Sequence, residues 1–100
     1  MSAEVMQDLV TTLTQLSGRP VFIDVANQQN STAAYVQFEG VLGDPQYDGD
    51  RVRVHVHYVS PLDEEPGFSV SASHLEAAGW LTPLQYRIAS NGLWISIFPR

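Results

Sequence analysis

The chain of 100 residues contains no cysteine and no lysine. Without cysteine there is no disulfide, no thiolate nucleophile and no cysteine-ligated zinc or iron–sulfur site. Without lysine there is no Schiff base and no P-loop phosphate site. The sequence also lacks the roughly 20 consecutive apolar residues that a membrane-spanning helix needs, and it lacks a basic leader before an apolar run. These absences predict no membrane association and a cytoplasmic protein.

Positive charge is scarce as well. Eleven acidic residues stand against five basic ones, which gives a formal net charge of -6 at pH 7. Because every neutralised phosphate needs a basic side chain nearby, direct binding of nucleic acid and attraction to anionic lipid are disfavoured. All five basic residues are arginines, which suit planar, bidentate contacts, and this usage is typical of a bacterial genome rich in GC.

The spacing of apolar residues predicts one helix followed by strands, within a single domain of residues 1–100. Apolar side chains recur with helical spacing over residues 3–16, and Gly18 follows as a stop. From Pro20 the period changes to two, which is the period of a strand. The strands expected from this alternation are residues 21–26, 32–42, 51–59, 68–72, 85–90 and 93–98.

Two local signals refine this outline. Ser73 and Glu76 have the spacing of a capping box, which predicts a short helical turn. Asn91 and Gly92 favour a type I′ turn, which predicts a hairpin of the last two strands. The fold class expected from the whole pattern is α+β, with an N-terminal helix followed by a five- or six-stranded antiparallel bent sheet or small barrel.

The beginning of the chain resembles a known fold family. Residues 16–23 read Leu-Ser-Gly-Arg-Pro-Val-Phe-Ile directly after the predicted helix, and residues 38–42 read Phe-Glu-Gly-Val-Leu. Over residues 1–42 this order resembles the opening of Sm-like and SH3-like small barrels, and the resemblance implies such a fold. The later sequence has no Ile-Arg-Gly-like segment of the kind with which Sm proteins read RNA, so no functional residue is carried over.

A strip of basic residues lies along the strand expected at 51–59. Arg51, Arg53, His55 and His57 share one face, because alternate residues of a strand point the same way. If this strand forms a hairpin with residues 32–42, Glu39 lies opposite Arg53 or His55, and the strip takes part in cross-strand pairing. The alternative is a partner-binding face whose positive charge rises as the histidines protonate below about pH 6.5.

The same two histidines have the spacing of a metal chelate, with α-carbons roughly 7 Å apart. Gly49 followed by five residues and His-Val-His resembles the first half of the cupin metal motif, which implies binding of a metal or a small ligand. No glutamate follows at the cupin position, and His74 supplies a third ligand only if it folds back over the strand. We expect no cofactor, and His55 and His57 stay weak metal candidates.

The terminal hairpin provides the other candidate site. With the turn at Asn91 and Gly92, Trp94, Phe98 and Arg87 share the face opposite the inward isoleucines. Large aromatic side chains and arginine are the residue types enriched at interface hot spots. Either these side chains are exposed and bind a partner, or the N-terminal helix covers them.

No catalytic or cofactor motif accompanies these candidates, so we do not expect an enzyme. Asp24 is the one carboxylate in an otherwise apolar strand, and we expect it to protect a sheet edge or to pair with an arginine. The sequence therefore predicts a non-enzymatic module that binds a protein partner or forms a homo-oligomer. Two alternatives are a small acidic inhibitor that mimics nucleic acid, through segments 44–50 and 63–65, and a cupin-like binder of metal or small ligands.

Overall fold

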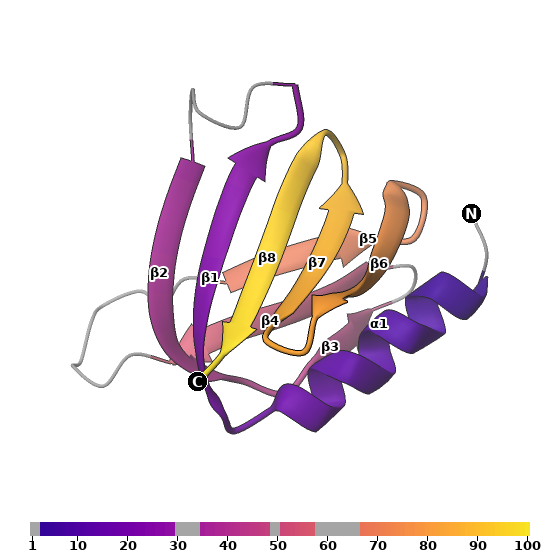
Figure 1. Cartoon of the computed structure of the whole chain (residues 1–100). Coiled ribbons are helices and arrows are strands. Elements are labelled where there is room, and N and C mark those ends of the chain that lie inside the picture. Colours follow the sequence, from indigo (N-terminus) through magenta and orange to yellow (C-terminus); the bar gives the residue numbers. More distant parts are fainter. Residues whose placement is uncertain (1–2, 30–34, 49–50, 58–66) are drawn as a thin grey trace.

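The computed structural model describes residues 3–29, 35–48, 51–57 and 67–100. One helix precedes eight strands in this part of the chain (Figure 1). The elements are α1 (Ala3–Leu16), β1 (Pro20–Asn27), β2 (Tyr35–Leu42), β3 (Gln46–Asp48), β4 (Arg51–His57), β5 (Gly67–Ser71), β6 (Leu75–Thr82), β7 (Gln85–Ser90) and β8 (Leu93–Pro99). The helix expected over residues 3–16 is confirmed, and Gly18 ends it with a φ of 82°.

The strands form two layers joined at one corner. Strands β2, β1, β8, β7 and β6 lie side by side in that order and form what we call the front sheet. Strands β3, β4 and β5 form what we call the rear sheet, with β4 in the middle. The rear sheet crosses behind the front sheet in Figure 1. The two sheets meet where Val41 and Leu42 of β2 pair with His57 and Val56 of β4.

The predicted α+β class is therefore confirmed, and of the two architectures expected the structure has the bent open sheet. In the part of the chain that the structure describes, β3 and β6 stand at opposite ends of the strand order and do not close a barrel. The count of eight strands exceeds the five or six expected from the sequence. The two unexpected strands are β3 and β6, which lie in segments that the sequence pattern assigned to a polar turn and a helical turn.

The core fills the space between the two sheets and α1. Leu9 and Leu13 of the helix are completely buried there, against the inner faces of both sheets. The other fully or nearly fully buried apolar side chains of this core are Met6, Leu16, Val21, Ile23, Leu42, Val52, Val70, Leu75, Tyr86, Ile88, Ile95 and Ile97. The helix is thus fixed on the inner side, where the hydroxyl of Tyr86 donates a hydrogen bond to Asp8 at 3.5 Å.

The helical turn predicted at Ser73 is wrong, because a strand occupies this segment. Leu75 is fully buried and pairs with Ser90, so β6 gains both a core contact and a backbone ladder with β7. The hydroxyl of Ser73 contacts that of Ser71 at 2.9 Å, and the amide of His74 donates to the carbonyl of Ser71. Burial and strand pairing therefore override the local capping signal.

The hairpin predicted at Asn91 and Gly92 is confirmed, with φ values of 51° and 77°. We expect Gly92→Ala to lower the free energy of unfolding by about 1 kcal/mol, because alanine resists a left-handed backbone. An added Cβ at Gly92 meets nothing within 4 Å, so the backbone alone causes this loss.

The matched control for Gly92→Ala is Gly79→Ala. An added Cβ at Gly79 also meets nothing within 4 Å, and Gly79 lies within β6 without a positive φ. We expect this control to keep the stability of the original chain. Urea unfolding followed by circular dichroism compares the two variants, and equal midpoints would contradict the prediction.

Candidate functional site

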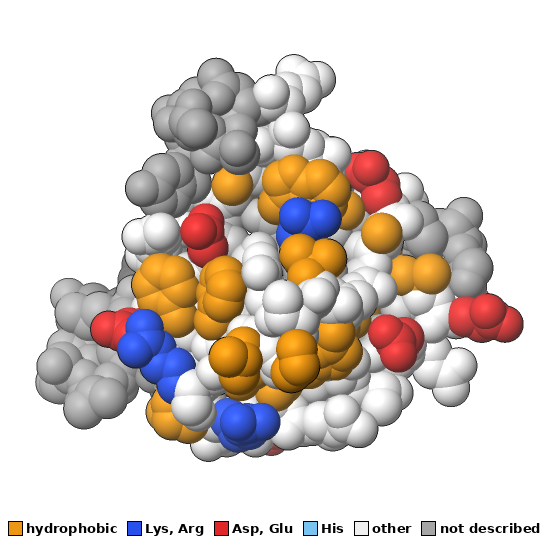
Figure 2. All heavy atoms as spheres, viewed as in Figure 1, with side chains coloured by type: hydrophobic (Ala, Val, Ile, Leu, Met, Phe, Trp, Pro, Cys, Tyr) orange, Lys and Arg blue, Asp and Glu red, His pale blue; other side chains and the backbone are white. Residues whose placement is uncertain are grey.

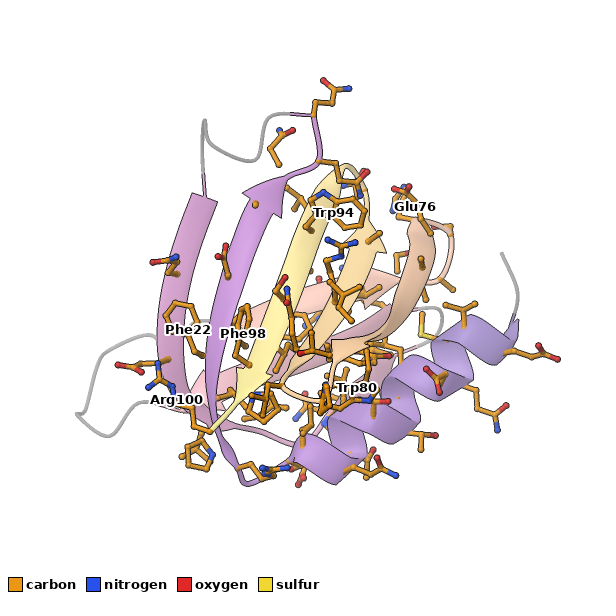
Figure 3. All side chains as sticks on the ribbon, viewed as in Figure 1. Phe22, Glu76, Trp80, Trp94, Phe98 and Arg100 are labelled. Atoms are coloured by element: carbon orange, nitrogen blue, oxygen red, sulfur yellow. The ribbon has the colours of Figure 1, made fainter. Side chains whose placement is uncertain are left out.

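The candidate site is the face of the front sheet that points away from the core, which we call the outer face. Along β8 the buried Ile95 and Ile97 alternate with Trp94 and Phe98, which are half-buried and point outward. The helix lies on the other side of this sheet, so the alternative that it covers Trp94 and Phe98 is wrong. Figure 2 views the outer face, and Figure 3 shows Phe22, Phe98 and Trp94 rising from it.

One end of the outer face carries a pair of phenylalanines. Phe22 of β1 lies directly opposite Phe98 of β8, with their ring centroids 5.9 Å apart. The guanidinium of Arg100 lies 5.6 Å from the centroid of the Phe22 ring and forms an ion pair with Glu39 at 3.3 Å. Together with Asp24, these aromatic and arginine side chains line an open hollow of about 410 Å³.

The other end of the outer face is built around Trp94. The guanidinium of Arg87 lies 4.1 Å from the centroid of the indole, which is a close cation–π contact. Ala77 and Ala89 continue the same cross-strand row toward the edge, and Gly79 lies opposite Arg87. Because these three residues are small, a shallow hollow of about 290 Å³ opens beside the stacked pair.

A polar row runs across the middle of the outer face, between the two aromatic ends. Asp24 of β1 and Arg87 of β7 both lie opposite Ser96 of the central strand β8. The side chain of Gln37 donates a long hydrogen bond of 3.4 Å to Asp24. The expectation that Asp24 protects a sheet edge is wrong, because β1 is paired on both sides. Among the described residues no arginine forms an ion pair with Asp24, and no carboxylate pairs with Arg87.

The basic strip of β4 lies on the rear sheet, away from the outer face. Arg51 and Arg53 are exposed and alternate with the buried Val52, so they point away from the core on the opposite side of the molecule. The predicted pairing of Glu39 with this strip is wrong. Strands β3 and β5 occupy the two edges of β4 at Arg51 and Arg53, and β2 reaches β4 near His57 alone.

The histidine pair is described by its backbone. His55 and His57 belong to the extended strand β4, as predicted, while their side chains lie outside the described part of the structure. His55 pairs with Gly67, whereas His74 follows the other end of β5, roughly 13 Å further along the strand direction. The described residues include no group of three side chains suited to hold a metal ion.

The sequence did not predict that several other residues belong to the outer face. Alternation with the buried Val21 and Ile23 points Phe22 outward, but the strand that brings Phe98 beside it lies at the far end of the sequence. Ala77 and Gly79 were missed because their segment was expected to begin with a helical turn. The acidic segment 63–65 of the inhibitor hypothesis lies outside the described residues, so that alternative stays a prediction.

Within the described residues no helix is long and apolar enough to cross a membrane. No protein-family model, no curated protein and no solved structure matches the sequence or the fold of this chain.

Proposed function

We propose that this chain is a non-enzymatic, cytoplasmic protein-interaction module that binds its partner through the outer face of the front sheet. The observation that carries the proposal is the gathering of Trp94, Phe98, Phe22 and Arg87 on a sheet face that no described element covers. Tryptophan and arginine are the residue types that contribute most to binding energy in protein interfaces. The contact with Trp94 holds the Arg87 guanidinium in place before binding, which lowers the entropy lost in a complex.

The charges of the outer face support a protein as the partner. The arginines Arg87 and Arg100 are matched by the carboxylates of Asp24 and Glu39, so the face has no excess of positive charge. A nucleic acid would require such an excess, and the chain as a whole carries a net charge of -6. A mixture of aromatic side chains and charges of both signs is typical of protein interfaces.

Two aromatic residues on different sheets, Trp94 and Tyr47, provide a matched test of this proposal. Trp94 is half-buried on the outer face, whereas Tyr47 is 62% exposed on β3 of the rear sheet. Because hot-spot truncations cost about 2 kcal/mol or more, we expect Trp94→Thr to weaken partner binding at least roughly 30-fold. We expect Tyr47→Thr to bind as the original chain does.

The measurement uses the immobilised chain and its two variants with native lysate, to which a differently tagged second copy of the chain is added. Quantitative mass spectrometry then records every captured protein, and circular dichroism checks that each variant is folded. Capture that is lost in Trp94→Thr and kept in Tyr47→Thr supports the proposal. Equal capture by both variants, or an original chain that neither captures a protein nor self-associates in sedimentation velocity, would overturn it.

A further inference from the structure

We propose that the partner of the outer face is a second copy of this chain, held face to face by two reciprocal contacts between Asp24 and Arg87. This inference rests on the proposed function, because it uses the same surface and names its occupant. It follows from the positions of the two charges in the sheet, from the absence of an oppositely charged partner for either of them within the described part of the chain and from the symmetry of a dimer.

The two charges occupy equivalent places on either side of β8. Asp24 and Arg87 both pair with Ser96, so they stand in one cross-strand row with the central strand between them. Two strand spacings of about 4.8 Å place their α-carbons roughly 10 Å apart. The side chain between them is a short serine, which is buried among its neighbours and accepts a long hydrogen bond of 3.4 Å from the side-chain amide of Gln85.

Each of these charges lacks an opposite charge within the part of the chain that is described. Asp24 accepts one long hydrogen bond from Gln37, and Arg87 contacts the face of the Trp94 ring. A cation–π contact does not neutralise a guanidinium, so its N–H groups can still pair with a carboxylate. Arg100 shows the contrast on the same face, because it already forms an ion pair with Glu39 at 3.3 Å.

A two-fold axis parallel to β8, above Ser96, makes the two faces complementary. This rotation exchanges the sides of β8, so Arg87 of each copy faces Asp24 of the other, and two ion pairs form. Trp94 and Phe98 lie along β8 on either side of Ser96, and each meets its own counterpart near the axis. Aromatic pairs in offset or edge-to-face arrangement stabilise such contacts.

The size of the face predicts a weak dimer. Five strands of about seven residues span about 24 by 23 Å, which is roughly 550 Å² for each copy and about 1,100 Å² in total. This area is at the lower end of specific interfaces, so we expect a dissociation constant on the order of 10–100 µM. The net charge of -6 on each copy opposes association, but at physiological ionic strength this repulsion is screened beyond about 8 Å.

Charge exchange tests the reciprocal contacts directly. Arg87→Glu places two carboxylates together at both contacts, and Asp24→Arg places two guanidiniums together. We expect each variant alone to dimerise at least roughly tenfold more weakly than the original chain. In an equimolar mixture of the two variants every contact joins opposite charges again, so we expect a heterodimer. The double variant restores both the contacts and the original net charge.

Sedimentation velocity up to about 500 µM, well above the expected dissociation constant, measures the association of each protein and of the mixture. The matched control is Arg51→Glu, which changes the net charge as Arg87→Glu does but lies on the rear sheet. We expect this control to dimerise as the original chain does. Circular dichroism confirms that every variant keeps its fold.

The outcomes distinguish the failure of the reciprocal dimer from the failure of the proposed function. A monomeric original chain, or a dimer that Arg87→Glu leaves unchanged, would overturn the reciprocal dimer, and so would a mixture that fails to associate. In these cases the proposed function still stands if Trp94→Thr abolishes the capture of another protein. Loss of the dimer in each single variant and its return in the mixture would support both.

Discussion

Replacing Leu13 with alanine is expected to lower the free energy of unfolding by about 3 kcal/mol. Leu13 is completely buried in the core, where α1 packs against the two sheets. Removal of its branched side chain takes away apolar contacts and leaves a cavity that the flanking strands cannot fill, because their backbones are fixed by sheet pairing. The loss is a large part of the stability of a domain of this size.

Guanidinium unfolding monitored by circular dichroism measures this effect. The matched control is Gln15→Ala, two positions further along α1 and exposed to solvent. We expect the control to change the free energy of unfolding by no more than about 0.5 kcal/mol. If the two variants were equally stable, the assignment of the Leu13 side of α1 to the core would be incorrect.

The second large effect is a loss of stability at high pH that depends on Tyr86. Burial, reinforced by the nearby Asp8 carboxylate, raises the pKa of Tyr86 to about 12, although a hydrogen bond with Thr12 acts in the opposite direction. The folded chain therefore holds this proton more tightly than the unfolded chain, in which the pKa is about 10. The resulting stabilisation is complete below pH 10 and decreases as the pH rises toward 12, by up to about 2.5 kcal/mol.

The composition of the chain makes this effect unusually easy to isolate. Cysteine and lysine are absent, so tyrosine is the side chain that titrates between pH 10 and 12. Chemical unfolding at several pH values should show the decline in the original chain and in Tyr47→Phe, whose side chain is 62% exposed. Tyr86→Phe should remove it. A decline of the same size in Tyr86→Phe would show that another group is responsible.

The elements that the sequence predicted well are those whose signals are local. The helical spacing of residues 3–16 and the turn at Asn91 and Gly92 depend on neighbours within one element, and the structure confirms both. Counting outward from that turn places Ile88 opposite Ile95, and the two residues are paired in the structure. The alternation of side chains along β8 likewise predicts that Trp94 and Phe98 share one outward face, and this is where they lie.

The parts that could not be predicted depend on contacts between distant segments. The strand β6 forms because its backbone pairs with β7 and because Leu75 is buried in the core. Neither contact can be predicted from residues 73–79 alone. The same holds for the outer face, where Phe22 and Asp24 join Phe98 and Arg87 through the pairing of β1 with β8. Local periodicity gives the direction of a side chain, but it does not reveal which strand will lie beside it.

The central place of β8 has a consequence for the kinetics of folding. Its hairpin with β7 closes through a two-residue turn, which is a microsecond event, whereas Ile97 meets Ile23 across 74 positions of the chain. Since long loops close slowly, the docking of β1 onto the preformed hairpin is expected to limit the rate, on a timescale of milliseconds to seconds. Until β1 docks, the unpaired edge of β8 can pair with the same edge in another molecule. The yield of refolding should therefore fall as protein concentration rises.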